Sequence, residues 1–379
     1  MAESKAVKEP LVRIEKNPGM PKWKSISIRL GSLVIALLVS ALFIYLVGGL
    51  SIGEAFTQMW EGTFGVVGNM TSIKIRCWDT VLYATKLLVI AAALAPAFKM
   101  KFWNIGAEGQ VIIGALATAI IMHDYAEALS KPVLFILMFA VCIIAGGIWG
   151  LIPAYFKAKF GTNETLFTLM MNYVAMKIMD AFYNDWRGQK SAMESINADT
   201  GLGYLPRILD HGYTLNIIFF VVIAVLMYFY LKRTKHGYEI SVVGESKNTA
   251  RYAGINVKKV IIRTMAISGA ICGLCGGMTV MGQSHSISSE TTAGGYGFTA
   301  IIVAWLAKFN TITMIGISLL IIFLEKGTAQ LGNVYPAFAT GAGDVLIGLV
   351  LFFIIGSEFF VNYKLIFRKK KSAGEEAAA

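Results

Sequence analysis

Long runs of apolar residues, separated by short polar segments, dominate this sequence. A helix needs roughly 20 apolar residues to cross about 30 Å of hydrocarbon, whereas a membrane β-strand shows about ten residues of alternating character. The runs here are of helical length and do not alternate, and a helix satisfies all its backbone groups in lipid. The pattern therefore predicts an all-α polytopic membrane protein. Its ten expected membrane helices cover residues 30–48, 81–98, 105–122, 132–155, 164–181, 214–231, 260–281, 298–307, 312–325 and 341–360.

Two of these helices are preceded by polar sequence that contains glycine. The stretch KFWNIGAEGQ, from Lys101 to Gln110, follows the second helix, and SSETTAGGYGF, ending at Phe298, follows the seventh. The eighth segment, 298–307, is too short to span alone, so we expect either a half-helix or a helix extended by buried polar sequence. With the first interruption inside and the second outside, helices two to five and seven to ten are predicted to form an inverted repeat around a transport path.

Charge changes this picture by assigning sides to the segments. The chain has 379 residues, of which 56% are hydrophobic and 15% charged, with a net charge of +11 and a mean hydropathy of +0.63. Segments on one side of the predicted helices carry 25 Lys and Arg residues and those on the other side carry 7. The positive-inside rule therefore favours cytoplasmic termini, and the excess charge indicates contact with anionic lipid rather than nucleic acid. The segments expected inside are 1–29, 98–103, 156–162, 232–263, 307–311 and 361–379.

This assignment also gives the expected domain organisation. Residues 1–29 are predicted to be a basic cytoplasmic segment, and residues 361–379 a cytoplasmic tail. The region 30–360 forms the transmembrane domain, with a cytoplasmic loop at 232–260.

Motifs for catalysis and metal binding are missing from the sequence. It contains no GxxxxGK[ST] phosphate loop, no HExxH, no GxSxG, and no Asp or His constellation at metal spacing. Cys272 and Cys275 form a CxxC without a nearby His or Asp, so we expect them to pack as small apolar residues. The chain is therefore not expected to be an enzyme, to hydrolyse ATP or to hold a metal or cofactor of its own.

The first interruption carries candidate functional side chains, namely Asn104, Glu108 and Gln110. A carboxylate near the bilayer centre costs roughly 3 kcal/mol, so some interaction must offset its burial. Asn104 and Glu108 are four residues apart and would share one face of a continuous helix. One interpretation makes Asn104 an N-cap and leaves Glu108 in headgroup water. The other makes these residues a polar lining turned away from lipid.

A second polar cluster, GTNETLFTLMMNY, runs from Gly161 to Tyr173 at the start of the fifth helix. Glu164, Thr168 and Asn172 recur every four residues and so form one stripe. Such a stripe faces protein or a water-filled path rather than lipid, and hydrogen bonding between helices is the simpler alternative. The candidate pathway residues are Asn104, Glu108, Gln110, Glu164, Thr168 and Asn172.

The longest cytoplasmic connection, Lys232 to Val260, contains a short helix signal. Ser246 can cap a helix that carries Ala250 to Ala253 before Gly254 ends it. From the pattern alone, this helix is equally suited to the lipid surface and to docking of a cytoplasmic partner.

Three segments together resemble one family. NIGAEGQ (Asn104 to Gln110), GTNE (Gly161 to Glu164) and VGESKNTARYAGINV (Val243 to Val257) resemble the permease subunits of bacterial ATP-binding-cassette importers for branched-chain amino acids, ribose and nucleosides. The resemblance covers about residues 30–365 and is greatest to the nucleoside permeases. It implies import of a nucleoside or a related small polar solute across the bacterial cytoplasmic membrane.

The resemblance also implies partners. These are a separate ATPase subunit that consumes the ATP, a second permease chain of different sequence, and an extracytoplasmic solute-binding lipoprotein. Coupling to the ATPase is expected at Gly244, Glu245, Ala250, Arg251, Tyr252 and Gly254. The alternative is an ion-gradient-driven secondary transporter, which would have no need of the helix in this loop, and a polytopic membrane enzyme is a weaker third.

Overall fold

The computed structural model describes residues 12–16, 19–209, 211–290, 292–338 and 341–367. The chain forms two compact units, one made of Met1–Val66 with Leu324–Ala379 and the other of Val67–Phe323. Among the described residues, seven helices are long and apolar enough to cross a membrane. The molecule is thus an all-α polytopic membrane protein apart from one short pair of strands, whereas the number of ten crossings and the inverted repeat stay predictions.

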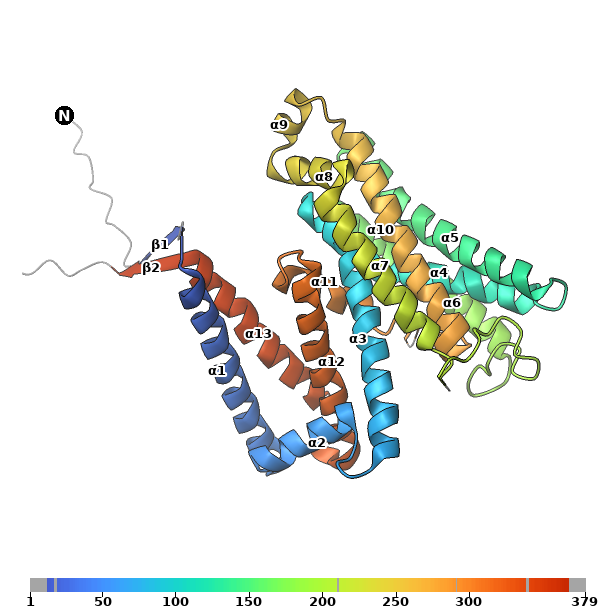
Figure 1. Cartoon of the computed structure of the whole chain (residues 1–379), viewed down its shortest axis with the longest axis horizontal. Coiled ribbons are helices and arrows are strands. Elements are labelled where there is room, and N and C mark those ends of the chain that lie inside the picture. Colours follow the sequence, from blue (N-terminus) through green and yellow to red (C-terminus); the bar gives the residue numbers. More distant parts are fainter. Residues whose placement is uncertain (1–11, 17–18, 210, 291, 339–340, 368–379) are drawn as a thin grey trace, which may run out of the picture. The chain divides into compact units, whose positions relative to one another are not determined.

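Each of the ten predicted spans largely overlaps one helix (Figure 1). These helices are α1 (Lys22–Gly48), α3 (Met70–Lys99), α4 (Ala107–Asp124), α5 (Lys131–Phe160), α6 (Glu164–Arg187), α7 (Thr214–Arg233), α10 (Val257–Thr279), α11 (Tyr296–Leu306), α12 (Thr311–Val334) and α13 (Ala342–Asn362). The other elements are α2 (Ile52–Phe64), α8 (Lys235–Glu245), α9 (Lys247–Tyr252), the π-helical turn η1 (Val280–Ser284), the 3-10 turn η2 (Pro336–Phe338), and the strands β1 (Val12–Lys16) and β2 (Tyr363–Phe367).

Several helices extend beyond the apolar runs that predicted them. Helix α3 begins at Met70 rather than at residue 81, because the side chain of Asn69 accepts a hydrogen bond from Ser72 N and caps the helix there. Helix α12 continues past residue 325 to Val334. Hydropathy thus located the apolar part of each helix, whereas capping and local packing set its ends.

In the first unit, α1 packs against α13. The unit also contains α2, which lies in a segment for which the sequence predicted no helix. Helix α2 begins with a capping box, in which Ser51 and Glu54 satisfy each other's backbone N–H groups. A buried apolar cluster holds the unit together and comprises Ile44, Leu50, Ala55, Leu331, Phe338 and Leu346.

The two ends of the chain contain a feature that the sequence analysis did not predict. Strand β1 pairs antiparallel with β2, with Val12 opposite Phe367 and Lys16 opposite Tyr363. These strands lie inside the segments 1–29 and 361–379, which had been predicted as a basic segment and a tail. Alternation over five residues is too short a signal to separate from a polar segment, and the strand forms because a partner strand is present. Residues 1–11 and 368–379 lie outside the described residues.

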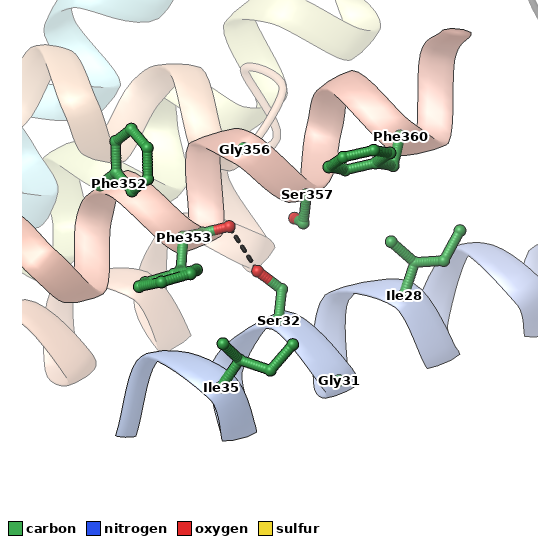
Figure 2. Close-up of a pocket in the computed structure, with 9 residues that line it drawn as sticks. All are labelled: Ile28, Gly31, Ser32, Ile35, Phe352, Phe353, Gly356, Ser357 and Phe360. Atoms are coloured by element: carbon green, nitrogen blue, oxygen red, sulfur yellow. Dashed lines mark hydrogen bonds between the residues drawn. The ribbon is translucent and has the colours of Figure 1, made fainter. Parts of the chain in front are cut away.

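A groove of about 410 Å³ lies between α1 and α13. Figure 2 shows Ile28 and Ile35 on α1 and Phe353 and Phe360 on α13 along its walls. The hydroxyl of Ser32 donates to the carbonyl oxygen of Phe353 and fixes the two helices together. The remaining lining is apolar or small, as expected for membrane helices that contact through small residues.

The second unit is built around α10, which packs most extensively against α5 and α4. Glycines make these contacts possible: a Cβ atom on Gly273 would overlap the carbonyl oxygen of Cys142, and one on Gly146 would overlap that of Gly269. Backbones therefore touch directly, which favours van der Waals contact between helices in lipid.

The segments expected inside meet at one end of this second unit. Gly244 of α8 packs against the carbonyl of Lys99, and Phe98 stacks on Phe309 with 6.2 Å between ring centroids. Lys157 and Arg251 line one cavity at the same end.

The loops on the other side of the predicted helices, which include 182–213 and 282–297, meet elsewhere in the unit. Asn197 donates to the Met122 carbonyl over 2.7 Å, and Ile196 N donates to the His285 carbonyl over 2.7 Å. Within the second unit, Figure 1 places α8 and α9 at one end and the loop after α6 at the other. These contacts bring together loops that the charge pattern assigns to the same side, and the assignment of sides stays a prediction.

Candidate solute pathway and coupling site

The two glycine-containing interruptions come together at Glu108. Its side chain is almost fully buried, at 2% exposed. Oε1 accepts a hydrogen bond from Gly295 N over 2.8 Å, and Oε2 accepts one from Gly297 N over 2.7 Å. Gly295 is the N-cap of α11, so the carboxylate lies at the positive end of the helix dipole. These interactions offset the cost of burying Glu108.

This contact also shows where α11 begins. We expected the second interruption to lie on the outer side and the first on the inner side. The end of the second interruption lies at Glu108, because the eleven-residue α11 is too short to span and begins among the other helices. The sides of the two interruptions stay predictions. Of the two alternatives for the eighth segment, the half-helix is the one observed.

A buried lysine lies beside this junction. Lys86 of α3 is 1% exposed, and its ammonium donates to the Thr292 carbonyl over 2.9 Å. The ammonium also lies 5.1 Å from the ring centroid of Tyr296, and its charge attracts the Glu108 carboxylate. Buried charges require such partners, and here they join α3, α4 and the start of α11.

One of the two interpretations of Asn104 and Glu108 is wrong. Helix α4 has Gly106 rather than Asn104 at its N-cap, and Glu108 is not in headgroup water. Asn104 precedes the helix, so these two residues do not share a face of one continuous helix. The Asn104 amide oxygen instead accepts from Gly106 N over 2.9 Å and stabilises the turn into α4.

The stripe on α6 faces this turn, as predicted for a polar stripe that avoids lipid. Thr168 Oγ1 accepts from Ile105 N over 3.1 Å, and Asn172 Oδ1 accepts from Gly109 N over 2.9 Å. Asn172 Nδ2 donates to the Ile105 carbonyl over 2.8 Å. The two residues therefore clamp the polar turn, which is the hydrogen bonding between segments that the simpler alternative expected.

Glu164 lies at the start of the same stripe but has a different partner. Its carboxylate forms an ion pair with Lys157 over 2.6 Å, and both side chains are largely buried. Glu164 thus connects the start of α6 with the end of α5.

Two polar atoms of the predicted pathway set have no hydrogen-bond partner among the described residues. They are Nδ2 of Asn104 and the carbonyl Oε1 of Gln110, and both are buried. The Gln110 amide nitrogen lies 3.5 Å from Asn104 Oδ1, at the limit of a hydrogen bond. Buried groups of this kind have unused capacity for water or a polar solute.

A neighbouring aromatic pair was not predicted from the sequence. Tyr83 of α3 stacks on Tyr296 with 5.8 Å between ring centroids, and Gln283 donates to the Tyr83 hydroxyl over 2.9 Å. Tyr296 is 7% exposed, so it packs inside the helix bundle rather than on its surface. The glycines around Tyr296 were the available signal, whereas nothing in the sequence connected Tyr83 with Gln283.

The helix signal in the loop between α7 and α10 is confirmed. Ser246 Oγ accepts from Thr249 N over 3.2 Å and caps α9, and Gly254 follows with a φ of +74°. Tyr252 projects outward at 94% exposed, whereas Ala250 is fully buried. Helix α8, which precedes α9 and packs against it, was not predicted from the sequence.

An ion pair attaches α8 to the helix bundle. Arg263 of α10 donates to Glu239 of α8 over 2.8 Å. This hydrogen bond and the positive charge of Arg263 lower the pKa of the Glu239 carboxyl below its usual value. The ion pair thereby connects α8 to α10.

The fold and these sites define a class of protein. The molecule is a polytopic helical membrane protein with a half-helix held among its helices and a small helical projection at one end. The described residues contain no group of three metal-ligating side chains, and Cys272 and Cys275 are buried, as expected for small apolar residues.

Residues 78–355 match the family model for the permease component of the branched-chain amino acid transport system. The chain therefore belongs to this family. It is the permease subunit of an importer of the ATP-binding-cassette type, and ATP hydrolysis takes place on a separate subunit.

Several curated proteins are similar over most of their length. The guanosine ABC transporter permease protein NupP of Bacillus subtilis is 28% identical and covers 90% of this chain and 96% of its own. The nucleoside ABC transporter permease protein NupB of Lactococcus lactis is 26% identical with the same coverage. The glucose ABC transporter permease protein TsgB13 of Haloferax volcanii is 26% identical over 82% of both chains. No solved structure matches significantly.

Proposed function

We propose that this permease forms the path for a nucleoside, or for a related small polar solute such as a sugar. Similarity to guanosine and nucleoside permeases over nearly the whole chain carries this proposal, and the glucose permease supports the wider solute class. The membrane is the bacterial cytoplasmic membrane, with both termini inside. The excess of Lys and Arg on one set of loops supports this orientation.

The predicted pathway residues serve this function mainly by holding in place the segments that form the wall of the solute path. Glu108 fixes the start of α11, and Thr168 and Asn172 fix the turn before α4. Glu164 ties α6 to α5. Asn104 and Gln110 retain the unpartnered polar atoms, which makes them the members of the set most suited to contact water or solute.

The predicted coupling residues divide into two groups. Glu245, Arg251 and Tyr252 are exposed on the projection and form the surface that contacts the ATPase subunit. Gly244 and Ala250 are buried and position α9, and Gly254 ends it with a left-handed backbone conformation.

Transport then follows from differential binding of ATP. ATP binding closes the ATPase dimer, the projections of the two permease chains move with it, and the path opens to the other side. ATP shifts this equilibrium only because the ATPase binds it more tightly in one state than in the other. The second permease, of different sequence, completes the path, and an extracytoplasmic lipoprotein delivers the solute.

Uptake by the whole complex in sealed vesicles tests the proposed function. Labelled nucleosides and sugars are offered with ATP, with a non-hydrolysable analogue, and with an ion gradient alone. We expect accumulation of a nucleoside that requires ATP hydrolysis. Accumulation driven by an ion gradient without ATP would identify a secondary transporter, and accumulation of a sugar alone would correct the solute class.

A further inference from the structure

A basic cavity lies at the end of the second unit that carries α8 and α9. Its volume is about 550 Å³. Three elements form it: the end of α5, helix α9 with the turn that follows, and the start of α10. The polar residues that matter for its chemistry are Lys157, Lys247, Arg251, Asn256 and Lys258.

Most of the positive charge in this cavity is uncompensated. Lys157 forms an ion pair with Glu164. Lys247, Arg251 and Lys258 are exposed, and none has an acidic partner in the part of the chain that the structure describes. Three cations therefore converge on one concave surface.

The start of α10 adds to this positive potential. Val257 and Lys258 occupy the first turn of a 23-residue helix, where backbone N–H groups lack acceptors within the helix. The Asn256 side chain accepts from Lys259 N. The helix dipole thus favours an anion at the point where the side-chain cations meet.

Aromatic residues indicate that the cavity lies at the level of lipid headgroups. Tyr155, Phe156 and Phe160 are exposed on the last turns of α5, on either side of Lys157. Exposed aromatic rings at the end of a membrane helix are typical of the interface between hydrocarbon and water. Ile255, Val257 and Ile261 give the cavity an apolar side as well.

We propose that this cavity binds the phosphate of an anionic phospholipid, with the acyl chains lying along the exposed face of α5. Converging cations suit the phosphate, and the neighbouring apolar and aromatic surface suits a lipid better than a freely soluble anion. Basic pockets between membrane helices at the cytoplasmic side bind headgroups of this kind. The inference requires membrane insertion but does not require coupling to ATP.

Native mass spectrometry of the full chain in detergent tests the proposal. Phosphatidylglycerol and phosphatidylcholine with identical acyl chains are compared for wild type, Lys258→Gln and Lys259→Gln. Lys258 lines the cavity, whereas Lys259 is an exposed lysine next to it that does not. We expect wild type to bind phosphatidylglycerol preferentially and Lys258→Gln to bind it about fivefold more weakly, the effect of one cation near a lipid surface.

The control variant decides between a defined site and general attraction. Lys259→Gln should retain wild-type affinity, and an equal loss in both variants would overturn the proposal. Lys247→Gln probes the same cavity from α9 and is used if Lys258→Gln does not fold. Displacement of the lipid by an equal concentration of inorganic phosphate would identify a soluble anion as the ligand instead. Equal binding of the two lipids would show that charge plays no part.

Discussion

At the scale of single residues, Glu108 explains why a carboxylate occurs in an apolar tract. Each of its two oxygens accepts a backbone hydrogen bond at the start of α11, and Lys86 supplies a nearby positive charge. Hydrogen bonds to charged groups contribute about 1.5–3 kcal/mol each. Glu108 therefore holds the start of the half-helix in place.

Replacement of this carboxylate tests that role. Glu108→Gln retains the shape of the side chain but removes the charge and directs an amide N–H towards backbone N–H donors. We expect a loss of about 1–3 kcal/mol of stability, measured as a lower unfolding temperature in detergent, together with reduced uptake. Glu127→Gln removes an exposed carboxylate and is the matched control. Equal unfolding temperatures for the two variants would contradict the fixing role.

Individual residues also show which contacts could be predicted from the sequence. The four-residue spacing of Thr168 and Asn172 predicted a stripe that avoids lipid, and the spacing was sufficient because α6 is one regular helix. The same reasoning failed for Asn104 and Glu108, because the helix begins between them at Ala107. Residue types identified the polar cluster, but the position of the helix end decided which atoms meet.

At the scale of elements, glycines determine how closely α5 and α10 approach. A Cβ atom on Gly146 would overlap the Gly269 carbonyl and Gly273 Cα, whereas one on Gly147 would lie in ordinary contact, 3.6 Å from the Ala266 carbonyl. Two adjacent glycines in one helix thus have very different surroundings.

A pair of alanine substitutions separates these surroundings. Gly146→Ala should destabilise the protein by about 1–3 kcal/mol, because the added methyl group forces the helices apart. Gly147→Ala should be neutral or stabilising by up to about 1 kcal/mol, because alanine is the better helix former. Thermal unfolding of both variants provides the measurement, and a larger loss for Gly147→Ala would contradict the observed packing.

The ion pair between α8 and α10 predicts a pH dependence. The pKa of Glu239 is lowered in the folded protein by Arg263, so its stabilising contribution is present above the ordinary value of 4.5 and is lost as the pH falls through the lowered pKa. Unfolding temperatures of wild type and Glu239→Gln should therefore differ near neutral pH and converge as the pH falls below 4.5 through the lowered pKa. A difference that grows towards acid would contradict this assignment.

At the scale of the whole molecule, the exposed end of α9 is the proposed connection to the ATPase. Arg251→Glu reverses a charge on this surface and should reduce uptake by roughly 5- to 150-fold, the range of typical coupling energies, without reducing membrane insertion. Uptake and solute-stimulated ATPase activity of the whole complex measure the effect. Normal values for both would rule out Arg251 as a coupling residue.

A second variant is needed because Arg251 also lines the basic cavity. Tyr252 is 94% exposed and lies outside that cavity. Tyr252→Ala should therefore reduce coupling and leave phosphatidylglycerol binding unchanged, whereas Lys258→Gln should weaken lipid binding. A loss of lipid binding in Tyr252→Ala would show that the two surfaces are not separate.

The sequence by itself determined that this protein folds in a lipid bilayer and approximately where along the chain its membrane helices lie. Runs of apolar residues and the uneven distribution of Lys and Arg report local transfer free energies, which depend little on the rest of the fold. The short helix between Ser246 and Gly254 was also predictable, because capping acts over a few neighbouring residues.

Only the tertiary structure decided which distant segments meet. Glu108 and Gly297 are far apart in sequence, as are Lys86 and Thr292, and no local pattern joins them. The same holds for β1 with β2 and for the cavity formed by α5, α9 and α10. These contacts depend on the close approach of glycine-containing helices and on the need of buried polar groups for partners, and both are satisfied only when the whole chain has folded.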